Sequence, residues 1–221
     1  VGIPVRPCYM YALTREGRKP PMVHVRQSLY SLLEPTKKKG NVVNLLGFFS
    51  PLVDDCELYD LLHSAGIKTI HEISRCRDFE EYKTMSEANF NLVLHQESRF
   101  AAEDFNDRLK IPFIELRRLY QTDKIQNQYQ ALASVLGVSF ELDKYREQAI
   151  EDFRKVCPDA SFAVGECMNG DPFELALALL KYEFKVPEIY GTITVENFVY
   201  MKQLALLSPE TKVFSNMEPT M

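Results

Sequence analysis

The sequence has no tryptophan, only nine glycines in 221 residues, and no long uncharged apolar run. A run of about 18 apolar residues would be needed for a membrane-spanning helix, so no span is expected. The short signatures GxxxxGK[ST], GxGxxG, HExxH and GxSxG do not occur either. These absences exclude the usual phosphate-loop, dinucleotide, zinc-hydrolase and serine-hydrolase motifs.

Cysteine is scarce and scattered, and no CxxC pair occurs. The five positions are Cys8, Cys56, Cys76, Cys157 and Cys167. An odd number at wide spacing argues against a disulfide framework and indicates a reducing compartment. We therefore expect a cytoplasmic protein.

The charge balance is ordinary for a globular protein. Apolar residues make up 46% of the chain, charged residues 26%, and the formal net charge is −5. Nucleic-acid binding needs a clustered basic face. The one basic run, at residues 37–39, is typical of a solvated turn, so neither nucleic acid nor a membrane is an expected partner.

Short apolar runs alternate with amphipathic helical patterns along the chain. The predicted strands of a first cycle are 42–46, 67–73, 91–95 and 111–116, and the predicted helices are 24–33, 53–65, 79–85, 99–110 and 124–136. Strands that start every twenty-odd residues leave room for one helix in each crossover and force parallel pairing.

A second cycle follows a longer charged helix, at 141–157. Its predicted strands are 161–165, 188–192 and 212–215, and its predicted helices are 171–184 and 196–207. The pattern predicts an α/β fold with a Rossmann-like doubly wound parallel four-stranded sheet and a second, incomplete three-stranded α/β domain. The predicted bounds are 1–40 for an extended segment and short helix, 41–140 for the Rossmann-like domain, 141–158 for a connector helix and 159–221 for the partial domain.

Ligands of open parallel sheets bind beyond the carboxyl ends of the strands. In the first predicted domain these ends offer Ser50, His95 and Ser98. A helix-cap or loop role is the simpler interpretation of His95. The second domain offers Cys167, but one thiolate cannot hold an iron–sulfur cluster.

Five segments carry a more specific pattern in a fixed order. They are Val-Asn-Leu-Leu-Gly at 43–47, Asp-Asp-Cys-Glu-Leu with Leu-Leu and Ala-Gly at 54–66, Ala-Asn-Phe-Asn-Leu-Val at 88–93, Leu-Lys-Ile-Pro-Phe at 109–113, and Tyr120-x-Thr122 before Leu136-Gly137. They resemble segments of the nitrogenase component 1 family, which comprises the molybdenum–iron protein subunits and their cofactor-assembly and protochlorophyllide-reductase relatives. The last segment lacks one glycine of the family pattern.

A sixth segment, Gln27-Ser28-Leu29, resembles the family's QSLGHH element, whose histidine lies near the iron–molybdenum cofactor. The resemblance implies that Gln27 and Ser28 face a cofactor or ligand. Tyr30 and Ser31 stand here where the family has glycine and that histidine.

The ligands of the family's metal clusters have no counterparts in this sequence. Matched to the family, the cysteines of the interfacial cluster would precede Val1, and the cofactor cysteine would fall at 144–147, where none occurs. The second cofactor ligand, a histidine, would follow Met221. Cys8 matches a cysteine that is not a ligand. We therefore expect no catalytic or metal-binding residue on this chain, and an iron–sulfur or molybdenum–iron type cluster only in a parent protein.

The resemblance implies the central portion of a nitrogenase-component-1-like oxidoreductase subunit, free of clusters and inactive alone. A homologous subunit and a P-loop iron-protein reductase would be its partners. The changed positions Ser31, Tyr145 and Arg146 leave a divergent paralogue open. Two alternatives remain: a two-lobed small-molecule-binding module that uses Ser50, His95, Ser98 and Cys167, and a non-catalytic cofactor-assembly scaffold.

Overall fold

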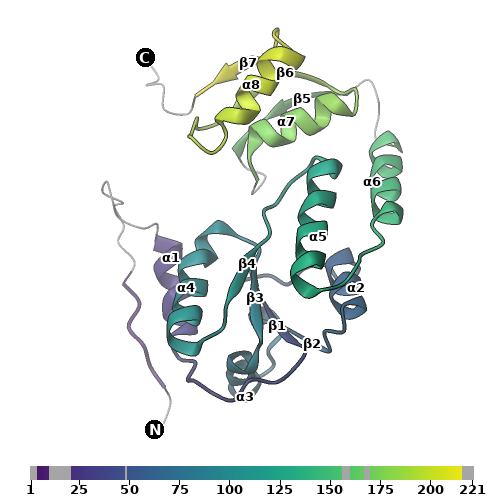
Figure 1. Ribbon diagram of the computed structural model, residues 1–221. Helices are drawn as coiled ribbons and strands as arrows, with labels where there is room; N and C mark the ends of the chain where they lie inside the picture. The colour runs from purple at the N-terminus through teal and green to yellow at the C-terminus, as the bar shows by residue number, and fades with distance from the viewer. Residues whose placement is uncertain (1–3, 10–20, 48, 156–159, 167–169, 216–221) are drawn as a thin grey trace. The chain divides into compact units, whose positions relative to one another are not determined.

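The chain forms two compact α/β units, Val1–Arg117 and Arg118–Met221. The computed structural model describes residues 4–9, 21–47, 49–155, 160–166 and 170–215 (Figure 1). The first unit contains a four-stranded sheet and the second a three-stranded sheet, and every strand pair is parallel. The predicted fold class is therefore confirmed.

The first sheet has the strand order β2-β1-β3-β4. Its strands are β1 Val42–Leu46, β2 Thr69–Glu72, β3 Phe90–Val93 and β4 Phe113–Glu115. The helices of this unit are α1 Pro21–Tyr30, α2 Glu57–Ser64, α3 Phe79–Lys83 and α4 Arg99–Leu109, with 3₁₀ turns η1 Ile73–Arg75, η2 Thr84–Glu87 and η3 Gln96–Ser98. Pro112 directly precedes the edge strand β4, where a missing N–H donor is tolerated.

The order of the strands explains why helices cover both faces of this sheet. The chain crosses from β1 to β2 in one direction and from β2 to β3 and β4 in the other. Right-handed crossovers therefore place α2 on one face and α3 and α4 on the opposite face. On the latter face Val42, Leu46 and Val93 join a core with Met85 and Phe105.

A pair of buried asparagines joins the two central strands. The Asn44 Nδ2 donates to the Asn91 Oδ1 at 2.7 Å and to the Met85 carbonyl at 2.9 Å, and both side chains are fully buried. Buried amides need such partners. The asparagine in the middle of β1 therefore helps to specify the pairing of β1 with β3 and the position of η2.

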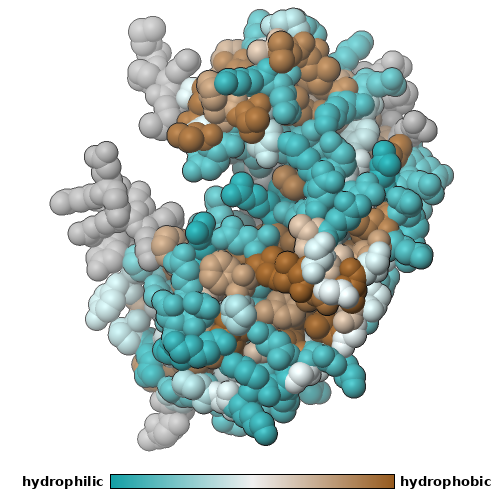
Figure 2. Space-filling model, in the orientation of Figure 1, coloured by the Kyte–Doolittle hydropathy of each residue, from teal (hydrophilic) through white to brown (hydrophobic). Residues whose placement is uncertain are grey.

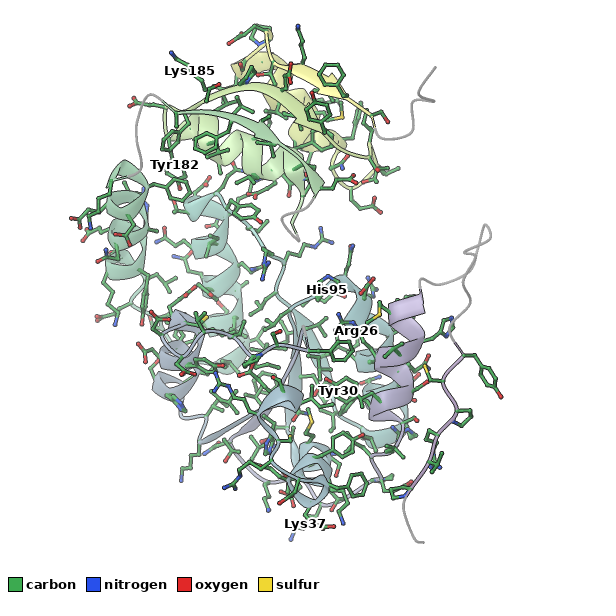
Figure 3. The ribbon with its side chains drawn as sticks, turned by 180° about the vertical axis from the view of Figure 1, so that it is seen from behind. Arg26, Tyr30, Lys37, His95, Tyr182 and Lys185 are labelled. Carbon is green, nitrogen blue, oxygen red and sulfur yellow. The ribbon has the colours of Figure 1, made fainter. Side chains whose placement is uncertain are left out.

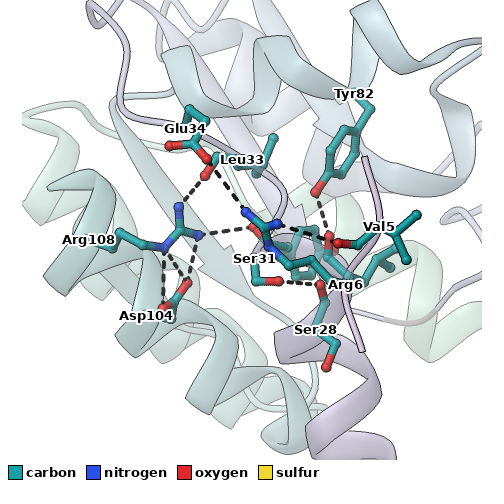
Figure 4. A network of polar contacts seen from close by, with 11 residues as sticks. Val5, Arg6, Ser28, Ser31, Leu33, Glu34, Tyr82, Asp104 and Arg108 are labelled. Atoms are coloured by element: carbon teal, nitrogen blue, oxygen red, sulfur yellow. Dashed lines mark hydrogen bonds and ion pairs between the residues drawn. The ribbon is translucent and has the colours of Figure 1, made fainter. Parts of the chain in front are cut away.

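Two side chains from neighbouring helices hold the carboxyl end of α1 (Figure 4). Arg108 of α4 donates to the carbonyls of Leu33 and Tyr30, and Tyr82 of α3 donates to the carbonyl of Leu29. Asp104 pairs with Arg108 at 2.9 Å. The last carbonyls of a helix have no intrahelical donors, so these contacts satisfy the end of α1 and fix it against the sheet.

The structure corrects several predicted boundaries, including the following three. Helix α1 begins at Pro21, three residues before the prediction, because proline suits the first helical turn. Helix α2 begins at Glu57 rather than at residue 53, since Cys56 is extended and Asp54 lies in the preceding loop, paired with Arg75. Strand β6 begins at Lys185 rather than at residue 188.

The second unit carries the sheet order β5-β6-β7. Its elements are α5 Thr122–Leu136, α6 Asp143–Lys155, β5 Ser161–Val164, α7 Pro172–Lys181, β6 Lys185–Tyr190, α8 Phe198–Leu207 and β7 Lys212–Phe214. Both crossovers run in the same direction, which places α7 and α8 on one face, where Phe173 of α7 packs in one core with Val164 and Ile189 of the sheet.

Helix α8 exposes much of its apolar surface. Figure 2 shows brown side chains over this part of the second unit. The exposed members on the helix are Phe198, Val199, Leu206 and Leu207. Helices that are apolar all round are typical of buried positions, so this surface is unusual for an exposed helix. None of the helices formed by the described residues has the length and hydrophobicity needed to cross a bilayer.

Glu174 ties the start of α5 to α7 within the second unit. Its carboxylate is 1% exposed and accepts the backbone N–H of Tyr120 at 2.8 Å and of Gln121 at 3.1 Å, and the Gln121 Nε2 at 3.0 Å. The predicted first domain, 41–140, includes α5. Helix α5 lies in the second unit because of these long-range contacts, which the periodicity of apolar residues does not predict. The predicted domain bounds stay a prediction.

We predict that Glu174→Gln lowers the free energy of unfolding by about 2 kcal/mol, because an amide nitrogen would face backbone donors that now bond a carboxylate. Hydrogen exchange should become faster at the amides of Tyr120 and Gln121. Glu147→Gln, on the exposed side of α6, is the matched control and should change neither quantity. Equal effects of the two substitutions would contradict this role of Glu174.

Candidate functional site

The carboxyl ends of β1 and β3 form the candidate site of the first unit. The chain leaves β1 toward β2 on one side and returns to β3 on the other, so this is the point where the strand order reverses. Ligands of open α/β sheets bind at such switch points. Gly47 follows β1 here, and η3 at 96–98 follows β3.

Arg26 of α1 lies at this edge and is 5% exposed. Its Nη1 donates to the Gly47 carbonyl and lies 3.3 Å from the Ser98 Oγ, and its guanidinium lies 4.7 Å from the centre of the Phe49 ring. The Ser98 Oγ also donates to the Gly47 carbonyl, at 3.2 Å. Helix α1, the end of β1 and η3 therefore meet at the Gly47 carbonyl, and the Arg26 guanidinium contacts both Gly47 and Ser98.

Glu97 and His95 complete the cluster; Figure 3 labels Arg26 and His95. The Glu97 Oε2 lies 3.6 Å from the Arg26 Nη2 and 3.8 Å from the His95 Nδ1. The His95 Nδ1 accepts the backbone N–H of Glu97 at 3.3 Å, so this side chain caps η3. The cap role that the sequence favoured for His95 is therefore confirmed.

The loop between β1 and α2 is fixed by Glu72 at the end of β2. Glu72 is 6% exposed and accepts the Leu52 N–H at 2.9 Å, the Arg75 Nε at 3.0 Å and the Tyr59 hydroxyl. Arg75 donates in turn to the Leu52 carbonyl at 2.9 Å. This network positions the loop that carries Phe49 and Ser50.

The structure brings together some of the predicted site residues. His95 and Ser98 lie in the Arg26 cluster, on one short segment. Gln27 and Ser28 follow Arg26 on α1 and are half-buried, and the Ser28 carbonyl accepts the Ser31 hydroxyl at 2.7 Å. Ser50 is exposed, one residue beyond Phe49. Cys167 lies outside the described residues.

Arg26, Glu97 and Glu72 are not among the site residues predicted from the sequence. A signal for Arg26 was present: Val23, Arg26, Tyr30 and Leu33 are all buried and follow the spacing of one helical face. A charged residue on such a face is unusual and indicates a buried polar contact. Glu72 gave no comparable signal, because its partners lie 13 and 20 residues away in sequence.

The thiols of Cys56 and Cys76 do not fit a metal cluster. Burial raises the pKa of Cys56 to about 11, with the Glu57 carboxylate adding to the effect, and burial also raises the pKa of Cys76. Metal binding needs thiolates, which these environments disfavour. No group of three His, Cys, Asp or Glu side chains within the described ranges is placed to hold a metal ion.

The fold and the Arg26 cluster together define an open parallel α/β protein with buried polar residues at its switch point. The sequence profile of the family described as "Nitrogenase component 1 type Oxidoreductase" matches residues 17–167, more than half of the chain. The chain belongs to this family, which confirms the resemblance described above. No match was found among the curated proteins.

Solved structures support the same fold. The structure titled "Nitrogenase Cp1 at pH 6.5" matches with a TM-score of 0.62 and 17% sequence identity, over 88% of this chain and 48% of that chain. "Nitrogenase Cp1 at pH 5" matches with a TM-score of 0.51 and 17% identity, over 88% of this chain and 39% of that chain. The chain thus spans about half the length of these structures or less.

We predict that Glu72 controls the ionisation of Tyr59. Burial, followed by the hydrogen bond to Glu72 and its charge, raises the pKa of Tyr59 to about 12. Glu72→Gln removes the charge and should lower this pKa toward the ordinary value of about 10. The pKa would be followed by an NMR titration of the labelled tyrosine ring.

Because the folded pKa of Tyr59 exceeds the unfolded one, its contribution to stability is complete below about pH 10 and is lost as the pH rises through about 12. Asp54→Asn removes only an exposed partner of Arg75 and serves as the control. An unchanged Tyr59 titration in Glu72→Gln would refute the coupling.

Proposed function

We propose that this chain is the central portion of a nitrogenase-component-1-like oxidoreductase subunit, and that it is cluster-free and inactive alone. Family membership and the two parallel sheets support the oxidoreductase scaffold. One observation carries the cluster-free part: the described thiols are dispersed, and burial raises the pKa of both Cys56 and Cys76. Such thiols are poor candidates for iron–sulfur ligands, which are thiolates.

Cofactors and partners of the whole protein belong to the same proposal. Family membership implies an iron–sulfur or molybdenum–iron type cluster in the parent, a homologous subunit, and a P-loop iron-protein reductase that delivers electrons. The exposed apolar side of α8 supports a protein partner, since large exposed apolar patches mark interaction sites. Scattered cysteines without a CxxC pair support a cytoplasmic location.

Anaerobic reconstitution with iron and sulfide tests the cluster-free proposal. The wild-type chain should retain no stoichiometric iron or sulfide and show no broad visible charge-transfer absorption. A variant with all five cysteines replaced by serine is the control, and the two proteins should give the same spectrum. A stoichiometric cluster in the wild-type chain that this variant lacks would overturn the proposal.

A second candidate function, small-molecule binding, is favoured by the gathering of His95, Ser98 and Arg26 at the switch point. In this candidate Gln27, Ser28, Ser50, His95 and Ser98 line the ligand crevice of the first unit. The residues reside on α1 and on the segments after β1 and β3, where open sheets bind ligands.

A thermal-shift screen of metabolites against the full chain tests this candidate. A ligand of the crevice should raise the melting temperature of the wild-type chain saturably and raise that of His95→Gln much less. His63→Gln, at the exposed end of α2, should respond like the wild type. A response that is equal in all three proteins, or no response to any metabolite, would contradict the candidate.

A further inference from the structure

The charge of Arg26 is deeply buried and incompletely paired. Its side chain is 6% exposed, its Nη1 is committed to the Gly47 carbonyl and the Ser98 hydroxyl, and its Nε has no partner among the described residues. The nearest carboxylate, Glu97, lies 3.6 Å from the Nη2, beyond a normal charged hydrogen bond. Buried guanidinium groups are normally paired and fully hydrogen-bonded.

Arg108, in the same unit, has a hydrogen-bond acceptor for each of its guanidinium nitrogens. Its Nε and Nη2 donate to Asp104 at 3.2 Å and 2.9 Å, its Nη1 donates to the Leu33 carbonyl, and its Nη2 also donates to the Tyr30 carbonyl. Arg108 is nevertheless more exposed than Arg26, with 30% of its side chain accessible. A purely structural role thus accounts for every guanidinium nitrogen of Arg108. It does not account for the Nε and Nη2 of Arg26.

We propose that Arg26 is the anchor of an oxyanion subsite, and that the Glu97 carboxylate occupies this subsite until a ligand's carboxylate or phosphate displaces it. Glu97 is suited to this role because its side chain is 26% exposed and makes a long ion pair that can open toward solvent. The planar fork of an arginine matches both carboxylate and phosphate groups.

The surroundings of Arg26 favour an incoming anion. Helix α4 begins directly after Ser98 and carries no acidic residue in its first turn, so its positive end adds to the guanidinium charge. Arg99 is engaged by Glu103 at 3.2 Å and Glu115 at 3.3 Å. Among these carboxylates, only Glu97 forms an ion pair with Arg26, so its displacement frees the Nη2.

This inference rests on the ligand crevice of the second candidate function and is independent of the oxidoreductase assignment. Binding of inorganic phosphate and of malonate to the full chain would be measured by calorimetry, with chloride at matched ionic strength as the control. The wild-type chain should bind one of the two oxyanions saturably and chloride not at all. Malonate alone would indicate a carboxylate ligand, and phosphate alone a phosphorylated one.

Four substitutions make the proposal falsifiable. Arg26→Met should weaken oxyanion binding about 10–100-fold, because a charged hydrogen bond is lost, and Arg26→Lys should bind more weakly than the wild type but better than Arg26→Met. Glu97→Gln removes the internal competitor and should tighten binding about tenfold. Arg77→Met, the control, removes an exposed arginine that pairs with Glu81 and should keep the affinity of the wild type.

Absence of saturable binding in both the wild type and Glu97→Gln would overturn the subsite, as would unchanged affinity in Arg26→Met. If Arg26→Met does not fold, the expected tightening in Glu97→Gln and weakening in Arg26→Lys still decide the question. A neutral metabolite whose binding survives Arg26→Lys and Glu97→Gln would keep the crevice and remove only the oxyanion subsite.

Discussion

The bond from Arg26 to the Gly47 carbonyl joins the three segments on which the candidate site of the first unit depends. Arg26 belongs to α1, Gly47 follows β1, and Ser98, which bonds the same carbonyl, ends η3 directly before α4. The opposite end of α1 is held by Arg108 and Tyr82. Helix α1 is therefore fixed at two points, and the one nearer its start brings a buried positive charge to the switch point of the sheet.

Much of the fold could be predicted from sequence because parallel α/β proteins repeat one simple unit. Apolar runs such as the one at 42–46 specify strands covered on both faces, and the spacing of the runs determines parallel pairing. Local signals also succeeded: Gly137 adopts the left-handed conformation of a helix C-cap, with φ of 70°. Long-range polar contacts escaped prediction, and they decide where α2 begins and which unit includes α5, through Glu72 and Glu174.

The candidate site was predictable in position more than in chemistry. The rule for the carboxyl ends of strands selected His95 and Ser98, which both lie in the Arg26 cluster. It could not select Arg26, which comes from a helix that precedes the sheet and reaches Gly47 across 21 residues of sequence. Glu97 could not be predicted because its role is electrostatic and depends on Arg26, which lies 71 positions away in the sequence.

The scaffold of this chain is that of an oxidoreductase family, whereas the chemistry of its polar residues favours the binding of an anion. Its family is the nitrogenase component 1 type oxidoreductases, yet its described thiols are dispersed and burial raises the pKa of both Cys56 and Cys76, while its best-formed polar cluster surrounds an arginine. The central claim is that Arg26 binds an oxyanion in place of the Glu97 carboxylate. A crystal structure of the chain with selenate tests it most directly, because selenium scatters anomalously. The account predicts an anomalous peak within hydrogen-bond reach of the Arg26 Nη2 and a displaced Glu97 carboxylate. An intact Arg26–Glu97 pair with no selenate beside it would contradict the account.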